Sequence, residues 1–310
     1  MHFTLVEREN GNGTLLLRQA YRVRSQLARG PSNAICSRRP ALLHSLASMA
    51  RQRLGQHFLG DIGWRKRILN TLPLAPHQTW VEIGPGHGEM TQMLAGDERR
   101  VIAIEADEAL ALGLRTTIET EPQRWPGVEV VYSDVLAADI GKLGGDRFHV
   151  YGNLPYYITS PILHRLFQWA ERIASIHIVI QLEVARRIAA PPGVRDYGYL
   201  STLCQFYAKP KIALRIPPGA FRPPPKVDSA LIGMTLPGEG ALLGITDPWG
   251  FLAFVQMCFA QKRKTLRNNL LEIADDRRIQ RALAAAALRP DARAEQLSLA
   301  QFAAIFGRLA

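Results

Sequence analysis

The chain has 310 residues, of which 47% are apolar and 21% are charged, and its formal net charge at pH 7 is +11. Its length corresponds to about two domains, and its composition excludes a largely disordered chain, a collagen-like repeat and an acidic solvating protein. The positive charge favours a polyanionic partner, either nucleic acid or an anionic membrane surface.

The remaining composition excludes several kinds of site. Cys36, Cys204 and Cys258 are far apart and none belongs to a CxxC pair, so we expect no disulfide framework or zinc ribbon. This cysteine usage is consistent with a reducing compartment. The histidines show no HxxxH or HxH spacing, so no metal site is predicted. No apolar run approaches the roughly 18 residues that cross a bilayer, so no membrane partner is expected.

The first 48 residues differ from the rest of the chain. They hold seven Arg, no Lys and two acidic residues, so they carry +5 of the net charge and leave +6 for the remainder. An Arg-rich, acid-poor start can be an organellar transit peptide, but Glu7, Glu9 and the Gly11–Gly13 turn suit that class poorly. We therefore expect residues 1–48 to be a disordered basic extension, or to precede a true start at Met49.

The middle of the chain alternates short apolar runs with helical stretches. Runs buried on both faces that alternate with helices predict a parallel, doubly wound sheet of the α/β class. Ser160 is expected to cap one helix, with Pro161 at its first helical position. The strands are expected at residues 80–83, 101–104, 128–132, 149–151 and 176–180, and the helices at 88–95, 107–119 and 160–169.

The last third of the chain changes character. Residues 214–216 and 229–235 predict two late strands at the sheet edge, joined through the Pro-rich segment 221–226. A Pro-Gly linker follows residue 236, and only helical patterns come after it. The expected fold is thus a Rossmann-like sheet with a small all-helical C-terminal domain. The four C-terminal helices are expected at residues 249–260, 264–273, 277–288 and 298–309.

A glycine-rich stretch, VEIGPGHG, joins the first strand of the sheet to the next helix. Glycines there let the backbone approach a ligand at a helix N-terminus. Glu105 ends the next strand and is placed to accept hydrogen bonds from a ribose, and Asp134 follows the third strand. The third glycine of the NAD pattern is replaced by Glu89, and no Walker Lys-Ser/Thr pair is present. These departures favour S-adenosylmethionine, and Asp134 could accept a hydrogen bond from the adenine amino group of that cofactor.

The turn after the fourth strand reads Asn153-Leu154-Pro155-Tyr156. An exocyclic adenine amine is a poor nucleophile because its lone pair is delocalised into the ring. The Asn153 side-chain oxygen and the Pro155 carbonyl can each accept one N–H and aim that lone pair at a methyl donor, while Pro155 stiffens the turn. Tyr156 offers a face for base stacking. This turn predicts methyl transfer to adenine by orientation and electrostatics, without a strong general base.

The chain resembles the KsgA family of small-subunit ribosomal RNA adenine N6,N6-dimethyltransferases. Five stretches carry the resemblance: RLGQHFL (53–59), VEIGPG (81–86), GNLPY (152–156), AFRPPPKVDS (220–229) and QKRKTLRN (261–268). The resemblance implies an enzyme that uses S-adenosylmethionine to place two methyl groups on each of two adjacent adenosines in a hairpin loop near the 3′ end of small-subunit rRNA.

The same resemblance implies roles for individual residues. His57 stands where many members have Asn, and Tyr157 replaces an Asn found in some members. The cofactor would be held by His57, Leu59, Gly84, Gly86, Glu105, Asp134 and Asn153, and the target base by Asn153, Leu154, Pro155, Tyr156 and Phe221. Phe221 resembles the second stacking residue of the family; the alternative is a core aromatic at a strand turn.

Two basic clusters are interpreted as phosphate contacts that position RNA without reading its sequence. One includes Arg51, Arg53 and residues 65–67 near the cofactor entrance. The other lies on a C-terminal helix, and its alternative is a solvated helix face. The residues of this second cluster are Lys262, Arg263, Lys264 and Arg267.

These observations divide the chain into an extension (1–48), an S-adenosylmethionine-dependent methyltransferase domain (49–237) and a helical RNA-binding domain (245–310). We expect a cytoplasmic monomer that acts on rRNA within a pre-assembled small subunit. The closest alternative is a related large-subunit rRNA methyltransferase of the antibiotic-resistance type. Two further alternatives are a non-catalytic nucleic-acid-binding relative of the mitochondrial transcription factor type and, less favoured, a DNA adenine methyltransferase.

Overall fold

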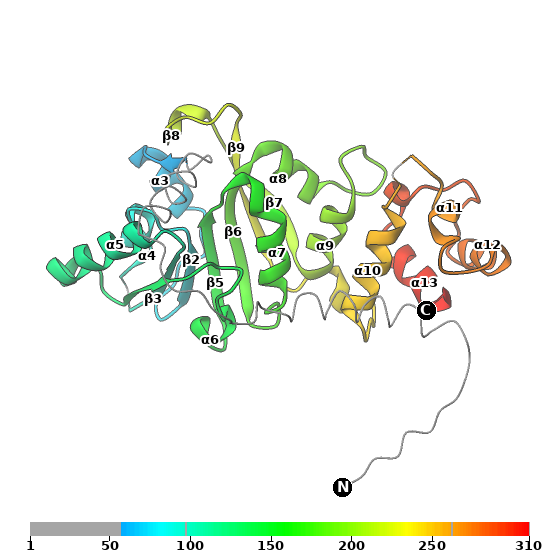
Figure 1. Ribbon diagram of the computed structural model, residues 1–310, viewed down its shortest axis with the longest axis horizontal. Coiled ribbons are helices and arrows are strands. Elements are labelled where there is room, and N and C mark those ends of the chain that lie inside the picture. The colour runs from blue at the N-terminus through cyan, green and yellow to red at the C-terminus, as the bar shows by residue number, and fades with distance from the viewer. Residues whose placement is uncertain (1–56, 97, 262, 310) are drawn as a thin grey trace, which may run out of the picture.

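A computed structural model describes residues 57–96, 98–261 and 263–309. Its centre is a seven-stranded sheet of order β4-β3-β2-β5-β6-β9-β7 (Figure 1). The first five strands in this order are parallel, and β9 runs antiparallel to both β6 and β7. The predicted parallel sheet with a late edge hairpin is therefore confirmed. The strands are β2 (Thr79–Ile83), β3 (Arg100–Glu105), β4 (Val128–Tyr132), β5 (Phe148–Asn153), β6 (Ile173–Gln181), β7 (Lys209–Ile216) and β9 (Ser229–Thr235).

Helices connect and cover these strands. Because parallel strands need crossover connections, helices separate β2 from β3, β3 from β4, β4 from β5 and β5 from β6. The helices of this part are α3 (Ile62–Leu69), α4 (Glu89–Leu94), α5 (Glu108–Thr120), α6 (Ile140–Gly144), α7 (Thr159–Phe167), α8 (Leu182–Ala189) and α9 (Tyr199–Tyr207). Four more form the C-terminal end: α10 (Pro248–Cys258), α11 (Leu266–Leu270), α12 (Asp276–Ala285) and α13 (Leu299–Leu309).

Short elements complete the described chain. A second, two-stranded sheet pairs β1 (Phe58–Leu59) with β8 (Phe221–Arg222) in antiparallel register. Five single 3₁₀ turns are η1 (Pro122–Arg124), η2 (Tyr156–Ile158), η3 (Pro218–Ala220), η4 (Glu239–Leu242) and η5 (Ala294–Gln296). Within the described ranges, none of the helices is long and apolar enough to cross a membrane.

Several helix boundaries differ from the sequence prediction by a few residues, and the starts of α7 and α11 show the local cause. Ser160 was expected to cap a helix, but α7 already begins at Thr159, because η2 leads directly into it and the preceding residue, Ile158, makes no side-chain cap. The helix expected at residues 264–273 spans only Leu266–Leu270, and it starts at Leu266 because Thr265 is its N-cap and accepts the amide of Asn268. A side-chain cap of this kind fixes the residue at which a helix begins.

The hydrophobic core runs without interruption from the sheet into the C-terminal helices. One cluster of buried residues includes strands β2, β3, β5 and β6 as well as helices α10 to α13. At the junction, the rings of Phe206 in α9 and Phe251 in α10 lie 5.3 Å apart. Figure 1 shows the C-terminal helices gathered at the end of the molecule opposite α5. The helical segment thus packs on the α/β part through shared apolar contacts, and the domain limits at 237 and 245 remain predictions.

The glycine loop supplies a stability test. Gly88 is the left-handed N-cap of α4 (φ 85°), and a Cβ added there would come within 2.5 Å of Leu114. Gly88→Ala should therefore lower the free energy of unfolding by about 1–3 kcal/mol in urea titrations. Gly307→Ala is the control, because Gly307 is exposed on α13 with no atom within 4 Å of an added Cβ. Gly307→Ala should raise the free energy of unfolding by about 0.5–1 kcal/mol. Equal effects of the two substitutions would show that Gly88 does not need its left-handed conformation or the space beside Leu114.

Candidate active site

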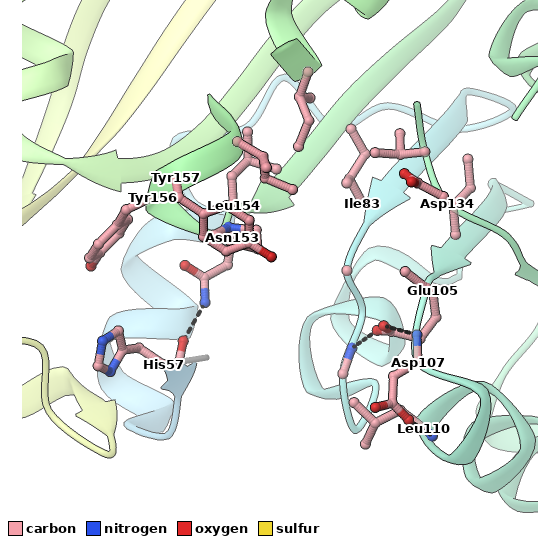
Figure 2. Close-up of a pocket in the computed structure, with 18 of the residues that line it drawn as sticks. His57, Ile83, Glu105, Asp107, Leu110, Asp134, Asn153, Leu154, Tyr156 and Tyr157 are labelled. Atoms are coloured by element: carbon pink, nitrogen blue, oxygen red, sulfur yellow. Dashed lines mark hydrogen bonds between the residues drawn. The ribbon is translucent and has the colours of Figure 1, made fainter. Parts of the chain in front are cut away.

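A cavity of about 210 Å³ opens at the carboxyl ends of the central strands. It lies where the chain order of the sheet reverses, with β3 on one side of β2 and β5 on the other, which is the usual place for a ligand in an open α/β sheet. Figure 2 shows residues from both sides facing this cavity. The lining residues are His57, Phe58, Ile83, Gly84, Gly86, Ile104 to Asp107, Leu110, Ser133 to Val135, Asn153 to Ile158 and Ile162.

The glycine loop forms one wall of this cavity. Gly84 and Gly86 both adopt positive φ angles, 69° and 60°, which residues other than glycine rarely adopt. A Cβ on Gly86 would lie 2.8 Å from the ring of Phe58, whereas a Cβ on Gly84 would meet nothing within 4 Å. The loop is therefore held tightly at Gly86 and leaves bare backbone at Gly84 facing the cavity.

Glu105 holds this loop in place from the end of β3. One carboxylate oxygen accepts the amide of Gly86 at 3.1 Å, and the other accepts the amide of Asp107 at 3.0 Å (Figure 2). Burial raises the pKa of Glu105, while these hydrogen bonds act in the opposite direction. Each carboxylate oxygen keeps further acceptor capacity, so Glu105 can bind hydroxyl donors in the cavity.

Asp134 lies on the same side of the cavity, directly after β4 (Figure 2). Its side chain is exposed, and Oδ1 accepts the amide of Leu136 at 2.9 Å. This hydrogen bond fixes the orientation of the carboxylate. The structure therefore places acidic acceptors at the ends of β3 and β4, in one row with the glycine loop.

Asn153 ends β5 on the opposite side. Its Nδ2 donates to the main-chain carbonyl of His57 at 2.7 Å, so the amide orientation is fixed and Oδ1 remains an acceptor (Figure 2). The carbonyl of Pro155 accepts the amide of Ile158 at 3.2 Å, so the predicted acceptor role there has to use its second lone pair. Tyr156 is anchored by a 2.7 Å hydrogen bond between its hydroxyl and that of Ser229, which fixes its ring beside Asn153.

His57 connects three separate segments. Its ring nitrogen Nδ1 lies 2.8 Å from the carbonyl of Pro223, and since a carbonyl only accepts, Nδ1–H is the donor. Its own carbonyl receives the Asn153 amide. The β1·β8 pair continues this connection, with Phe58 opposite Arg222. His57 thus ties the N-terminal motif to both the NLPY turn and the triple-proline loop.

Two predicted site residues lie elsewhere. Leu59 and Phe221 face each other in the β1·β8 register and belong to a buried apolar cluster with Trp80, and neither lines the cavity. Leu59 points away from its neighbour Phe58 because successive strand residues face opposite sides. Phe221 is fully buried, which agrees with the alternative of a core aromatic at a strand turn, and its stacking role stays a prediction.

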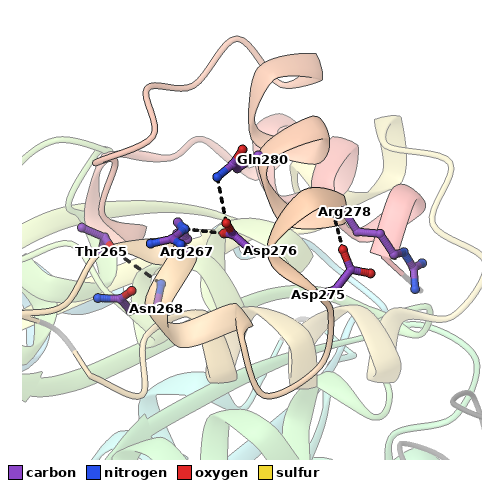
Figure 3. Close-up of polar contacts among 7 residues, drawn as sticks. All are labelled: Thr265, Arg267, Asn268, Asp275, Asp276, Arg278 and Gln280. Atoms are coloured by element: carbon purple, nitrogen blue, oxygen red, sulfur yellow. Dashed lines mark hydrogen bonds and ion pairs between the residues drawn. The ribbon is translucent and has the colours of Figure 1, made fainter.

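The predicted RNA contacts have mixed outcomes. Arg51, Arg53 and Lys262 lie outside the described residues. Arg263 and Lys264 are exposed, in the turn before α11 rather than on a helix. Arg267 instead donates to Asp276 at the start of α12, which also accepts from Gln280 at 2.9 Å (Figure 3). This ion pair connects α11 to α12, so Arg267 has a structural contact, and its phosphate contact stays a prediction.

Several residues in or next to the site escaped the sequence prediction. Phe58 supports Gly86, and Asp107 caps α5 by accepting the amides of Ala109 and Leu110. Glu82 lies in the middle of β2 and is 2% exposed. Burial raises its pKa to about 8, and among the described residues its Oε2 has no hydrogen-bond partner. A carboxylate within an apolar strand next to the glycine loop was the available signal for Glu82.

The chain matches known proteins over most of its length. Residues 47–310 match the family model "Ribosomal RNA adenine dimethylase". Proteins named "Ribosomal RNA small subunit methyltransferase A" from Acidobacterium capsulatum and Xanthomonas campestris are 41% and 40% identical to it, covering 86% and 83% of this chain and 93% and 95% of theirs.

Two solved structures are also similar. The structure titled as 23S rRNA methyltransferase ErmE has a TM-score of 0.60 and 30% identity, covering 81% of this chain and 99% of that one. A dimethyladenosine transferase from Plasmodium falciparum has a TM-score of 0.64 over 80% of this chain and 96% of that one; at 22% identity it supports the fold.

Glu82 gives a pH-dependent prediction. Because its pKa rises from 4.5 to about 8 on folding, its contribution to stability is fully present below pH 4.5 and is lost as the pH rises toward 8. Glu82→Gln should therefore reduce the fall in unfolding free energy between pH 5 and pH 8, measured in urea. Glu105→Gln is the comparison variant. Burial also raises the pKa of Glu105, so this variant should change the pH dependence of the unfolding free energy in the same direction. A pH slope unchanged in Glu82→Gln would contradict the assignment.

Proposed function

This chain belongs to the ribosomal RNA adenine dimethylase family, and from this membership we propose that it dimethylates N6 of two adjacent adenosines in a hairpin loop near the 3′ end of small-subunit rRNA. It is an S-adenosylmethionine-dependent methyltransferase. The observation that carries the choice of substrate is its identity of about 40%, over more than nine-tenths of their length, to proteins named for the small subunit. A role in small-subunit maturation accompanies this activity.

The alternatives are less well supported. The large-subunit enzyme ErmE is 30% identical, below the small-subunit relatives. A non-catalytic relative would not need an acceptor amide held in a fixed orientation, yet Asn153 is held by a 2.7 Å hydrogen bond beside the glycine loop and Glu105. The small-subunit activity is therefore the function that the site and the relatives favour together.

The residues of the cavity fit the cofactor. The bare backbone at Gly84 accommodates a closely approaching methionine portion, and a side chain at Gly86 would collide with Phe58. The Glu105 carboxylate would accept from the ribose hydroxyls, and Asp134 from the adenine amino group. Bound there, S-adenosylmethionine supplies an electrophilic methyl group on a sulfonium.

The NLPY turn would act on the target amine. Asn153 Oδ1 accepts one N–H, since its Nδ2 is committed to His57, and the free lone pair of the Pro155 carbonyl accepts the other. Two acceptors on one amine draw its nitrogen toward tetrahedral geometry and localise its lone pair. Tyr156, fixed through Ser229, offers its ring face to the adenine. Rate enhancement then comes from orientation and preorganised electrostatics, and the proton leaves after the nitrogen is alkylated.

The assembly and location of the protein also belong to this proposal. We expect a monomer that acts on a pre-assembled small subunit, and a location in the cytoplasm fits the two free thiols among the described residues, Cys204 and Cys258. The helical segment 245–310 would bind rRNA, with Arg263 and Lys264 exposed for phosphate contacts. The ion pair between Arg267 and Asp276 would hold α11 and α12 in register for this surface.

Asn153→Ala tests the role of the turn. The loss of a preorganised acceptor should lower kcat for methyl transfer at least about a hundredfold, while binding of unmethylated small subunits stays nearly intact. Labelled methyl transfer and filter binding measure the two quantities. Mapping the modified adenosines in the wild-type product identifies the substrate. Undiminished turnover in the variant would remove Asn153 from the mechanism.

Charge reversal tests the C-terminal surface. Changing Lys262, Arg263 and Lys264 to Glu should weaken binding of small subunits and flatten its dependence on salt, because fewer phosphates are neutralised. Lys142→Glu, at an exposed position on α6, is the control for a single charge reversal outside this surface. An unchanged affinity and salt slope in the triple variant would mean that these residues form only a solvated face.

A further inference from the structure

Tyr157 is the most exposed of the aromatic residues that line the cavity in the described structure. It lies in η2, lines the cavity and is 70% exposed. Among the large apolar side chains that the structure shows as exposed, only Tyr157 also lines the cavity. Figure 2 shows it beside Asn153, across the cavity from Glu105 and Asp134. An aromatic ring therefore stands at the mouth of the site, next to the residue that would hold the target amine.

The other aromatic residues near the site are already committed. Phe221 is fully buried in the core, and Tyr156 is partly buried with its hydroxyl bonded to Ser229. Phe58 is packed against the glycine loop at Gly86 and lies 5.1 Å from the ring of His87. Tyr157 alone among these four keeps most of its surface available for a ligand.

We propose that Tyr157 stacks on the nucleobase that neighbours the target adenosine. This inference rests on the proposed function, in which the two target adenosines are adjacent, so the neighbour is itself an adenine. With the target base held between Asn153 and Tyr156, the next base lies toward the cavity mouth, where Tyr157 stands. A flat aromatic face there holds an extruded base by stacking, independently of hydrogen bonds to its edges.

The choice of residue type at 157 then matters for substrate affinity more than for chemistry. Stacking binds the neighbouring base equally before and during methyl transfer, so its loss should raise KM and leave kcat nearly unchanged. Removal of a stacking aromatic typically weakens binding of a base about 5- to 150-fold. Because Tyr157 is largely exposed, its substitution should leave the fold intact.

The test compares Tyr157→Phe, Tyr157→Leu and Tyr157→Ala on unmethylated small subunits. We expect the Phe variant to match the wild type, and the Ala and Leu variants to raise both Kd and KM about tenfold with kcat within about twofold. Leu keeps apolar bulk without an aromatic face. Tyr132→Ala is the matched control, because Tyr132 is also an exposed tyrosine, at 50%, but does not line the cavity.

Several results would overturn the proposal. An unchanged Kd in Tyr157→Ala would exclude stacking. A Kd in Tyr157→Leu equal to that of the wild type would show that apolar bulk suffices. A loss of affinity in Tyr157→Phe as large as in Tyr157→Ala would show that the hydroxyl binds instead. Wild-type protein that binds small subunits without transferring methyl groups would contradict the proposed function, and the Kd series would still decide the role of Tyr157. Wild-type protein that does neither would overturn both.

Discussion

The hydrogen bond from the Asn153 side chain to the His57 carbonyl is the contact on which the site depends. It joins residues 96 positions apart and leaves the amide oxygen of Asn153 as an acceptor with a fixed direction. His57 is in turn held by Pro223, 166 positions along the chain, through its ring nitrogen. A single residue thus determines the relative positions of the N-terminal motif, the NLPY turn and the triple-proline loop.

A similar constraint operates across the cavity. Glu105 bonds to two backbone amides, one in the glycine loop and one at the start of α5, so a single carboxylate holds these two segments together at the carboxyl end of β3. Phe58 then closes the loop from the His57 side by packing against Gly86. The cofactor half and the base half of the site are therefore linked through two adjacent residues, His57 and Phe58, at the start of β1, so one short segment supports both halves.

The aromatic residues and the C-terminal cations show how packing redistributes roles among similar side chains. Phe221 fills a core position opposite Leu59, so the exposed aromatic face at the cavity is that of Tyr157. Arg267 pairs with Asp276 and becomes a connection between helices, whereas Arg263 and Lys264 stay in solvent. Residue type alone would have assigned the same function to all members of each group.

The sequence by itself determined the fold class and the positions of the central strands along the chain, and it predicted the glycine, acidic and NLPY elements of the site. These follow from local patterns: apolar runs of strand length, glycines at a strand end, and an amide before a proline. Only the tertiary structure decided which residues face the cavity. Leu59 and Phe221 are buried because β1 pairs with β8, more than 160 residues away, and Arg267 is engaged because α12 folds back on α11. Such pairings between distant segments leave no periodic signal in the chain, since they depend on how the elements pack.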